Sequence, residues 1–307
     1  MHSPPGDRVS AVIVHYRTPP ETIAAARAVA ETSRGTEILI VDNASGDGIE
    51  EEVSREGLPA RVILESANRG YGAACNRGAR ETSRPFLLFL NSDARVLPAA
   101  IGALVAALDA DEKAAAVGPR LVNPDGSLQR SIKRLPTPWR IFCESSGLAF
   151  ASGGRGVLSG HAATRQDHAS ARSVEALMGA ALLVRRSAFE DVEGFDEAFF
   201  LYAEETDLMA RWRRRGWRIL FDPRAEVVHE GGRSAGYRFF GQLHASLVRY
   251  TAKHHGAVAA SFVRVVLAGG AAVRYAAALL TPGENGRARR ERYRAALSRS
   301  GGPRRMG

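Results

Sequence analysis

Residues 85–93 read PFLLFLNSD, and this stretch decides how the chain is interpreted. Residues 86–90 form an apolar run of strand length that ends abruptly in Asn91, Ser92 and Asp93. In open α/β sheets, ligands bind just outside the carboxyl ends of the strands. A carboxylate placed there can hold a divalent cation against a diphosphate. Taken alone, the stretch favours a strand that runs into an ordinary polar turn, so the neighbouring segments have to decide between the two interpretations.

Length and composition indicate a globular protein and argue against a nucleic-acid partner. The chain has 307 residues, 45% hydrophobic and 24% charged, which is enough for one large or two modest domains. Its net charge is +9, but residues 283–307 contain eight arginines and two glutamates. The rest of the chain is therefore nearly balanced. We expect residues 283–307 to form a disordered basic tail that can touch anionic lipid.

Cysteine usage and hydropathy predict a cytoplasmic protein. The two cysteines fit a reducing compartment, and the apolar residues 9–14 are too few for a signal peptide. The apolar segment 256–280 is interrupted by Arg264 and Arg274, which argues against a membrane-spanning helix. Such a segment either packs on the folded domain or lies on an anionic membrane, so peripheral contact with the inner face of the cell membrane is one expectation.

Strands alternate with helices along the chain, which predicts an α/β fold with a mostly parallel central sheet flanked by helices. We expect one domain over residues 1–235, a helical extension over 236–282, and a mobile loop at about 144–173, where Gly, Ser and Ala are frequent. The predicted strands cover residues 9–15, 37–41, 61–65, 86–90, 115–117, 180–184, 218–221 and 226–229, and the predicted helices cover 19–33, 72–83, 97–109, 186–192, 204–216, 241–255 and 257–280.

Polar side chains follow four successive predicted strands. Tyr16 follows the first, Asp42 the second, Asn68 the third and Asp93 the fourth. The carboxyl ends of parallel strands meet at one edge of the sheet, so these residues are expected to line a single crevice.

Two glycines, Gly70 and Gly72, open the predicted helix after Asn68. Glycine lets backbone approach a phosphate closely, and a helix N-terminus favours an anion. A plain glycine turn into a helix explains the pattern equally well.

Acidic residues and one histidine complete the candidate set. Glu204, Glu205 and Asp207 open a predicted helix, where acids also occur because they complement the helix dipole. Asp207 could equally pair with Arg211 one turn later. His229 ends an apolar strand, and a neutral imidazole is a competent metal ligand.

Together these segments resemble the family-2 glycosyltransferases of the GT-A fold, especially bacterial rhamnosyltransferase-like members. The matching stretches are VSAVIVHYRTPP, ILIVDNASGDG, NRGYGAACNRGAR, FLLFLNSDARVLP, VGPRLVNPDGSLQ, MGAALLVRRSAFEDVEGFDEAFFLYAEETDLMARWRRRGW and VVHEGG, which span about residues 9–235.

The resemblance implies an inverting transferase. It would move a sugar from a nucleotide-diphosphate donor to a hydroxyl of a glycan or lipid-linked glycan in cell-envelope polysaccharide synthesis. Rhamnose from dTDP-rhamnose is the first choice of donor, with UDP-hexoses as the alternative, and the implied cofactor is a divalent cation, Mg²⁺ or Mn²⁺.

The resemblance also assigns roles to residues. Asp93 is the expected metal ligand at the end of the motif Asn91-Ser92-Asp93, and His229 can complete the metal site. Glu205 matches the general base, although the family has Asp there, and Glu204 is the other candidate base. Asp42 matches the position that contacts the nucleotide base. The implied donor-binding residues are His15, Tyr16, Asp42, Asn43, Asn68, Gly70, Gly72, Asn76, Asn91, Ser92 and Asp93, and those near the acceptor and donor sugar are Met178, Gly179, Ala180 and Asp207.

Two other protein classes compete with this interpretation. A non-catalytic nucleotide-sugar or glycan-binding module could keep the fold, but Asp93 and a candidate base are both retained. A sugar nucleotidyltransferase would have a glycine-rich loop after the first strand, where residues 15–20 read HYRTPP.

Overall fold

The structure is a computed structural model that describes residues 4–162, 168–231 and 240–298. The chain divides into two compact units, which are described separately. The first, here called the sheet unit, contains residues 1–132, 166–200 and 204–234. The second, here called the helical unit, contains residues 133–165, 201–203 and 235–307. The helical unit thus begins within the span predicted to be a single domain.

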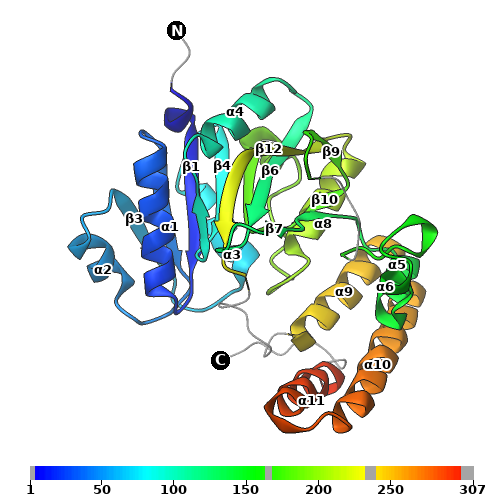
Figure 1. Cartoon of the computed structure of the whole chain (residues 1–307). Helices are drawn as coiled ribbons and strands as arrows, with labels where there is room; N and C mark the ends of the chain where they lie inside the picture. The colour runs from blue at the N-terminus through cyan, green and yellow to red at the C-terminus, as the bar shows by residue number, and fades with distance from the viewer. Residues whose placement is uncertain (1–3, 163–167, 232–239, 299–307) are drawn as a thin grey trace. The chain divides into compact units, whose positions relative to one another are not determined.

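The sheet unit is an α/β structure around one large sheet with the strand order β3-β2-β1-β4-β11-β6-β12-β5 (Figure 1). The neighbours from β3 to β4 are parallel, as are β6 and β12, whereas β11 and β5 run antiparallel to their neighbours. The strands of this path are β1 (Val9–His15), β2 (Glu37–Asp42), β3 (Ala60–Leu64), β4 (Phe86–Asn91), β5 (Ala94–Val96), β6 (Ala114–Val122), β11 (Ala181–Arg185) and β12 (Arg218–His229).

Short elements and helices complete the sheet unit. β7 (Leu128–Gln129) pairs with β6, and β9 (Arg172–Val174) pairs with β12. The other elements are the 3-10 helix η1 (Pro5–Arg8), α1 (Pro19–Thr32), α2 (Ile49–Arg55), α3 (Tyr71–Arg80), α4 (Ala100–Asp109), β8 (Ile132–Lys133, at the unit boundary along the chain), β10 (Ala176–Leu177), α7 (Arg186–Asp191) and α8 (Glu204–Arg214).

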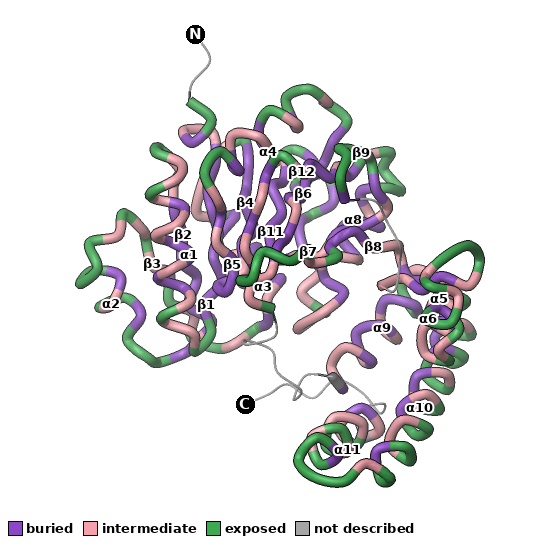
Figure 2. The backbone as a smooth tube through the Cα atoms, in the orientation of Figure 1, coloured by how far each residue is buried: buried purple, intermediate pink, exposed green. Residues whose placement is uncertain are grey.

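Both faces of the sheet are covered, which is why its strands read as continuous apolar runs. Every residue of β1 is buried, and the strands of the sheet appear buried along most of their length in Figure 2. Helix α3 approaches β1 closely at Gly78, where a Cβ atom would lie 2.4 Å from Val12 Cγ1. The predicted strands 218–221 and 226–229 form one strand, β12, with a register shift between Asp222 and Glu226.

The helical unit is built on α9 (Phe240–His255), α10 (Ala257–Leu279) and α11 (Gly283–Ser298). It also contains α5 (Pro138–Ser146), α6 (Leu148–Ala151) and the 3-10 helix η2 (Gly156–Leu158). Ile141 of α5 shares a small apolar core with Leu247 of α9 and with Val263 and Leu267 of α10.

Two expectations about disorder differ from the structure within the described residues. Helices α5, α6 and η2 occupy residues 144–146, 148–151 and 156–158 of the expected mobile loop 144–173. Thr137 caps α5 by accepting a hydrogen bond from the Arg140 N–H, and Ile141 joins the small apolar core. Residues 283–298 form α11 instead of a disordered tail. Gly286 lets α11 approach Thr281, and the Arg290 guanidinium donates to the Ala278 and Thr281 carbonyls at the end of α10. Residues 163–167 and 299–307 lie outside the described residues.

Helix α10 has an apolar, exposed side. By length and composition it could cross a membrane, with a mean hydropathy of 1.5 over 18 residues, of which 22% are buried; it is the single such helix in the described part of the chain. Ala260, Val263, Leu267 and Ala271 on one side are buried, and Figure 2 shows exposed stretches between buried ones along α10. That the two arginines within it prevent spanning stays a prediction.

His244 of α9 is expected to make the stability of the helical unit depend on pH. Burial, and then the charges of Arg274 and Arg292, lower the pKa of His244 to about 4. Its ordinary value in the unfolded chain is about 6.5. Between these two pH values the unfolded state binds a proton that the folded state does not.

We therefore predict that the free energy of unfolding of the helical unit falls by about 3 kcal/mol as the pH drops from about 6.5 to about 4. The variant His244→Phe should lose this part of the pH dependence, because phenylalanine does not titrate. Urea unfolding of both proteins at neutral and mildly acidic pH measures the difference. Equal pH slopes for the two proteins would contradict the assignment to His244.

Candidate active site

The carboxyl ends of the parallel strands meet at one edge of the sheet unit. In the strand register, His15 lies beside Asp42, and Val14 lies beside Asn91. The antiparallel strand β11 starts at the same edge, where the Asn91 N–H donates to the Ala180 carbonyl at 2.9 Å. The strand β12 ends there, with His229 beside Ala94. The fold therefore brings four chain segments to the end of β4.

Asp93 is buried at this edge, and it faces a histidine. Its Oδ1 atom lies 3.3 Å from His229 Nε2, and neither of its carboxylate oxygens accepts a hydrogen bond from the described residues. His229 Nδ1 lies 2.7 Å from Gln129 Oε1, and the Gln129 amide nitrogen donates to the Asn123 side-chain oxygen. Because an amide oxygen only accepts, Nδ1 carries the ring proton. In the neutral imidazole, Nε2 then carries the lone pair, and this nitrogen faces Asp93.

This donor set fits a divalent cation. A buried carboxylate without hydrogen bonds is costly, and a cation beside it would offset that cost. A histidine whose other ring nitrogen is held by an oxygen acceptor is the usual arrangement of a metal ligand. No group of three or more His, Cys, Asp or Glu side chains that could hold a metal occurs in residues 4–162, 168–231 and 240–298. Asp93 and His229 together would leave the other coordination positions of a cation to the substrate and to water.

Glu204 and Glu205 open α8 and point in different directions. Glu204 is buried towards α3, and burial, followed by the charge of Glu205, raises the pKa of Glu204 well above its ordinary range. Glu205 instead lies against Gly179, where a Cβ atom would come 3.3 Å from the Glu205 Cβ atom. Gly179 immediately precedes Ala180, whose carbonyl is bonded to Asn91. Glu205, unlike Glu204, is therefore on the side of the strand-end residues.

The glycines at the start of α3 have a packing role. At Gly70, φ is +93° and a Cβ atom would lie 2.1 Å from the Phe200 carbonyl oxygen. At Gly72, a Cβ atom would lie 3.0 Å from Phe195 Cβ. A side chain at either position would be crowded by the segment 195–200, so the packing of this segment explains both glycines. A role in the approach to a phosphate, which the sequence raised as one of two readings, stays a prediction.

Two asparagines tie loops together. The Asn76 amide donates to the Phe195 carbonyl at 2.9 Å and accepts from the Phe195 N–H at 2.9 Å. The Asn43 side chain donates to the Gly70 carbonyl and accepts from the Arg69 N–H. Both side chains bind neighbouring backbone, and their contact with the donor stays a prediction.

The residues after β1 and β2 are also linked to each other. The His15 ring bonds the Thr22 hydroxyl at 2.8 Å and the Asp47 carboxylate at 3.0 Å. Asp42 Oδ1 accepts from the Ser45 N–H at 3.0 Å, which fixes the turn after β2. His15 is fully buried, and the structure accounts for its ring through these partners.

The remaining predicted residues divide into exposed and internal positions. Tyr16 is partly exposed, with the Arg17 guanidinium over its ring, and Asn68 Oδ1 accepts from the Gly70 N–H. Ser92 is buried and accepts from the Thr18 hydroxyl. The partly buried Met178 donates its N–H to the Ser131 carbonyl, and the buried Asp207 accepts from Arg211 Nε at 2.7 Å. Asp207 thus has the ion pair that the alternative interpretation predicted.

Gln129 and Thr18 were missed by sequence reasoning. Gln129 sits in a two-residue strand, and its approach to His229 depends on the pairing of β7 with β6 and of β6 with β12. Thr18 reaches Ser92 only because β1 and β4 are adjacent. No local pattern signals either contact.

Comparison with known proteins identifies the family of the chain. The family model described as Glycosyl transferase family 2 matches residues 10–192. The chain belongs to this family. The prediction of family-2 membership is therefore confirmed, and the protein is a glycosyltransferase.

Two relatives of this family-2 glycosyltransferase illustrate the range of similarity. The N-acetylglucosaminyl-diphospho-decaprenol L-rhamnosyltransferase of Mycobacterium tuberculosis is 34% identical over 226 residues, which cover 67% of this chain and 70% of the relative. The low-salt glycan biosynthesis hexosyltransferase Agl10 of Haloferax volcanii is 26% identical over 217 residues, which cover 69% of this chain and 64% of the relative.

Two solved structures share the fold. The mannosyltransferase PcManGT from Pyrobaculum calidifontis, in complex with GDP-Man and Mn²⁺, matches with a TM-score of 0.57 and 16% identity over 98% of this chain and 87% of its own. GalNAc-T7 with UDP, GalNAc and Mn²⁺ matches with a TM-score of 0.56 and 16% identity over 79% of this chain and 47% of its own. The predicted GT-A fold is thereby confirmed.

We predict that Gln129→Met weakens Mn²⁺ binding about tenfold, because the His229 ring loses the acceptor that orients it. Gln129→Glu is the matched control, since it keeps an oxygen acceptor for Nδ1–H. Mn²⁺ affinity, measured by electron paramagnetic resonance with a nucleoside diphosphate present, reports the effect without turnover. Equal affinity of the Met and Glu variants would show that Gln129 does not act through His229.

Proposed function

We propose that this family-2 glycosyltransferase is a metal-dependent, inverting enzyme that transfers rhamnose from dTDP-rhamnose to a hydroxyl of a lipid-linked glycan in cell-envelope polysaccharide synthesis. The observation that carries the proposal is the buried Asp93–His229 pair just after β4. The same end of β4 is hydrogen-bonded to Ala180, and the preceding residue, Gly179, contacts Glu205. The choice of sugar and acceptor is supported by the Mycobacterium tuberculosis relative, whose name gives an L-rhamnosyltransferase acting on a diphospho-decaprenol glycan.

Asp93 and His229 would hold the divalent cation, with Mn²⁺ and Mg²⁺ both compatible with an oxygen and an imidazole ligand. When bound, the cation would neutralise charge that develops on the leaving nucleoside diphosphate. The presence of Mn²⁺ in the two solved structures supports a cation in this fold. The Gln129 acceptor keeps the His229 ring oriented for this task.

Glu205 is the proposed general base. It would take the proton from the acceptor hydroxyl while that oxygen forms the new bond to the anomeric carbon. The bond from the anomeric carbon to the diphosphate oxygen breaks in the same step, so the configuration inverts. Glutamate is one methylene longer than the aspartate of the family motif, and the absent side chain of Gly179 leaves room for the Glu205 methylenes.

Glu204 is less suited to the role of base. Its carboxyl is buried, and the raised pKa favours the neutral form, which cannot accept a proton from the acceptor. The remaining donor contacts are proposed for Asp42 on the nucleotide base and for Tyr16, Asn68, Asn91 and Ser92 around the nucleotide sugar. Met178, Gly179 and Ala180 would lie beneath the two sugars.

A UDP-hexose donor is the alternative within the same chemistry. It is supported by the hexosyltransferase relative and by the UDP and GDP-Man complexes of the fold relatives. A non-catalytic binding module remains the alternative from another class. Contact with the inner face of the cell membrane through α10 and α11 stays part of the proposal.

The donor assignment predicts that dTDP-rhamnose releases nucleoside diphosphate faster than UDP-hexoses when a lipid-linked N-acetylglucosaminyl diphosphate is supplied. Release should stop when the cation is chelated, because the diphosphate leaving group then loses its counter-charge. A panel of donors with a metal titration measures both effects. Silence of every donor, with and without acceptor, would leave the non-catalytic module as the better description.

The base assignment predicts different results for two neighbouring glutamates. Glu205→Gln should keep donor affinity and reduce transfer by roughly 10²- to 10⁴-fold, the usual contribution of a general base. Glu204→Gln is the matched control; it mimics the neutral carboxyl and should retain most of the transfer rate. Donor titration and single-turnover transfer separate binding from chemistry. Survival of transfer in Glu205→Gln would assign the base elsewhere.

A further inference from the structure

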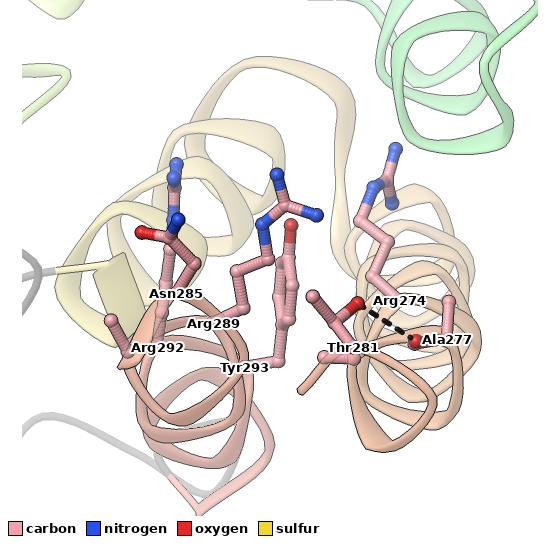
Figure 3. Close-up of a pocket in the computed structure, with 9 residues that line it drawn as sticks. Arg274, Ala277, Thr281, Asn285, Arg289, Arg292 and Tyr293 are labelled. Atoms are coloured by element: carbon pink, nitrogen blue, oxygen red, sulfur yellow. Dashed lines mark hydrogen bonds between the residues drawn. The ribbon is translucent and has the colours of Figure 1, made fainter. Parts of the chain in front are cut away.

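The helical unit contains a pocket of about 580 Å³ at the junction of α10 and α11. Arg274 from α10 and Arg289 and Arg292 from α11 line it, together with the hydrogen-bonding side chains of Asn285 and Tyr293. Figure 3 shows the guanidinium groups of Arg274 and Arg289 and the Tyr293 hydroxyl extending to the same side of the two helices. Among the described residues that line the pocket, none is acidic.

The pocket is a built feature of the fold. At Gly286, a Cβ atom would lie 1.9 Å from the Thr281 carbonyl oxygen, so α11 can approach the end of α10 only because this residue is glycine. The Arg290 guanidinium donates to the Ala278 and Thr281 carbonyls at 3.0 and 3.3 Å. It thereby satisfies carbonyls at the end of α10 and fixes the turn that closes the pocket.

The position of Arg274 is also fixed from within the helical unit. Its guanidinium donates to the Gly270 carbonyl at 3.0 Å and to the Glu144 carbonyl at 3.4 Å. Both partners are neutral backbone groups, so these bonds leave its positive charge uncompensated. Burial first, and then the charges of Arg274 and Arg292, lower the pKa of His244, which is consistent with positive charge on this side of α9.

An apolar stripe runs along another side of α10 and reaches the pocket end of the helix at Leu280. The side chains of Val258 and Leu280 are 87% exposed, and those of Val265 and Val273 are 71% exposed. With Phe262 they are spaced by four, three, eight and seven residues, which places them on one side of the helix; Leu280 is the residue after its end. Leu280 directly precedes Thr281, which lines the pocket. An apolar stripe that ends beside a cluster of arginines is complementary to a lipid chain that ends in a phosphate.

We propose that this pocket binds a phosphate ester carried by a lipid, with Arg274, Arg289 and Arg292 contacting the phosphate oxygens. Guanidinium groups bind phosphate through paired, charge-assisted hydrogen bonds. The Tyr293 hydroxyl and the Asn285 amide can supply further donors. The phosphate has two sources of the same chemistry, the headgroup of an anionic phospholipid and the diphosphate of a polyprenyl-linked acceptor. The second source rests on the proposed function, and the first does not.

The test is sedimentation of the full chain with three kinds of vesicle. These are phosphatidylcholine alone, phosphatidylcholine with phosphatidylglycerol, and phosphatidylcholine with a polyprenyl diphosphate. Arg289→Gln, alone and combined with Arg274→Gln, removes pocket charges. Arg287→Gln, alone and combined with Arg294→Gln, is the matched control, because both of these arginines are exposed on α11 and neither lines the pocket. Circular dichroism checks the helical content of each variant.

We expect the pocket double variant to lose about tenfold in partition to phosphate-bearing vesicles, and the control double variant less than about threefold. A loss confined to phosphatidylglycerol identifies the headgroup as ligand, and a loss confined to the polyprenyl diphosphate identifies the acceptor. Equal losses in pocket and control variants, at the single or the double level, would overturn the proposal in favour of general charge attraction. Absence of binding by the unaltered chain would overturn it as well.

Asp93→Ala separates this inference from the proposed function. It removes a ligand of the proposed metal site in the sheet unit and should bind all vesicles as the unaltered chain does. Conversely, the pocket variants should release nucleoside diphosphate from donor without acceptor at the unaltered rate. Vesicle binding can therefore be measured even if the enzyme releases no nucleoside diphosphate, and release can be measured even if the chain binds no vesicles.

Discussion

The candidate site depends on a carboxylate that is buried without a hydrogen bond. Asp93 lies at the end of an apolar strand, and the described residues offer it no hydrogen-bond donor. Leaving a charged group in that state costs several kcal/mol in a protein interior. The fold nevertheless places His229 Nε2 at 3.3 Å from it, and Gln129 accepts from the other ring nitrogen. With a neutral imidazole, two acceptors face each other, and a cation bound by both would offset the cost.

The strand register explains why the other site residues gather at the same place. The antiparallel strand β11 begins where β4 ends, so Gly179 and Ala180 lie beside Asn91. The neighbouring glycine then gives Glu205 room, while Glu204 is directed into the interior. Two adjacent glutamates therefore have different environments, and one fold can keep one carboxyl neutral and leave the other to act as a base.

Residues that end strands could be predicted from the sequence, because an apolar run followed by a polar residue is a local signal. Asp42 and Asp93 are such residues, and they lie at the same edge of the sheet. The contact between Gln129 and His229 could not be predicted, since it depends on the pairing of three strands. The two glycines of the 68–76 segment predict a turn into a helix. Their packing role could not be predicted, because the residue that Gly70 packs against, Phe200, lies far along the chain.

Helices α9 and α10 follow from the apolar pattern of residues 241–280, whereas α11 differs from the expected disordered tail. Residues 283–298 are rich in arginine and polar residues, so composition favours disorder. Their helix is supported by specific contacts, the close approach at Gly286 and the Arg290 bonds to the end of α10, which composition does not encode. The same contacts build the arginine-lined pocket. Arginines that composition assigns to a solvated tail therefore line a pocket of a folded unit.

The most direct test of the Asp93–His229 account is a calorimetric titration of dTDP into the unaltered chain and into Asp93→Asn, each with and without Mn²⁺. Asparagine keeps the shape of the side chain and removes the negative charge. The account predicts that Mn²⁺ tightens dTDP binding to the unaltered chain and has little effect on binding to the variant. Equal tightening by Mn²⁺ in both proteins would show that Asp93 does not hold the cation.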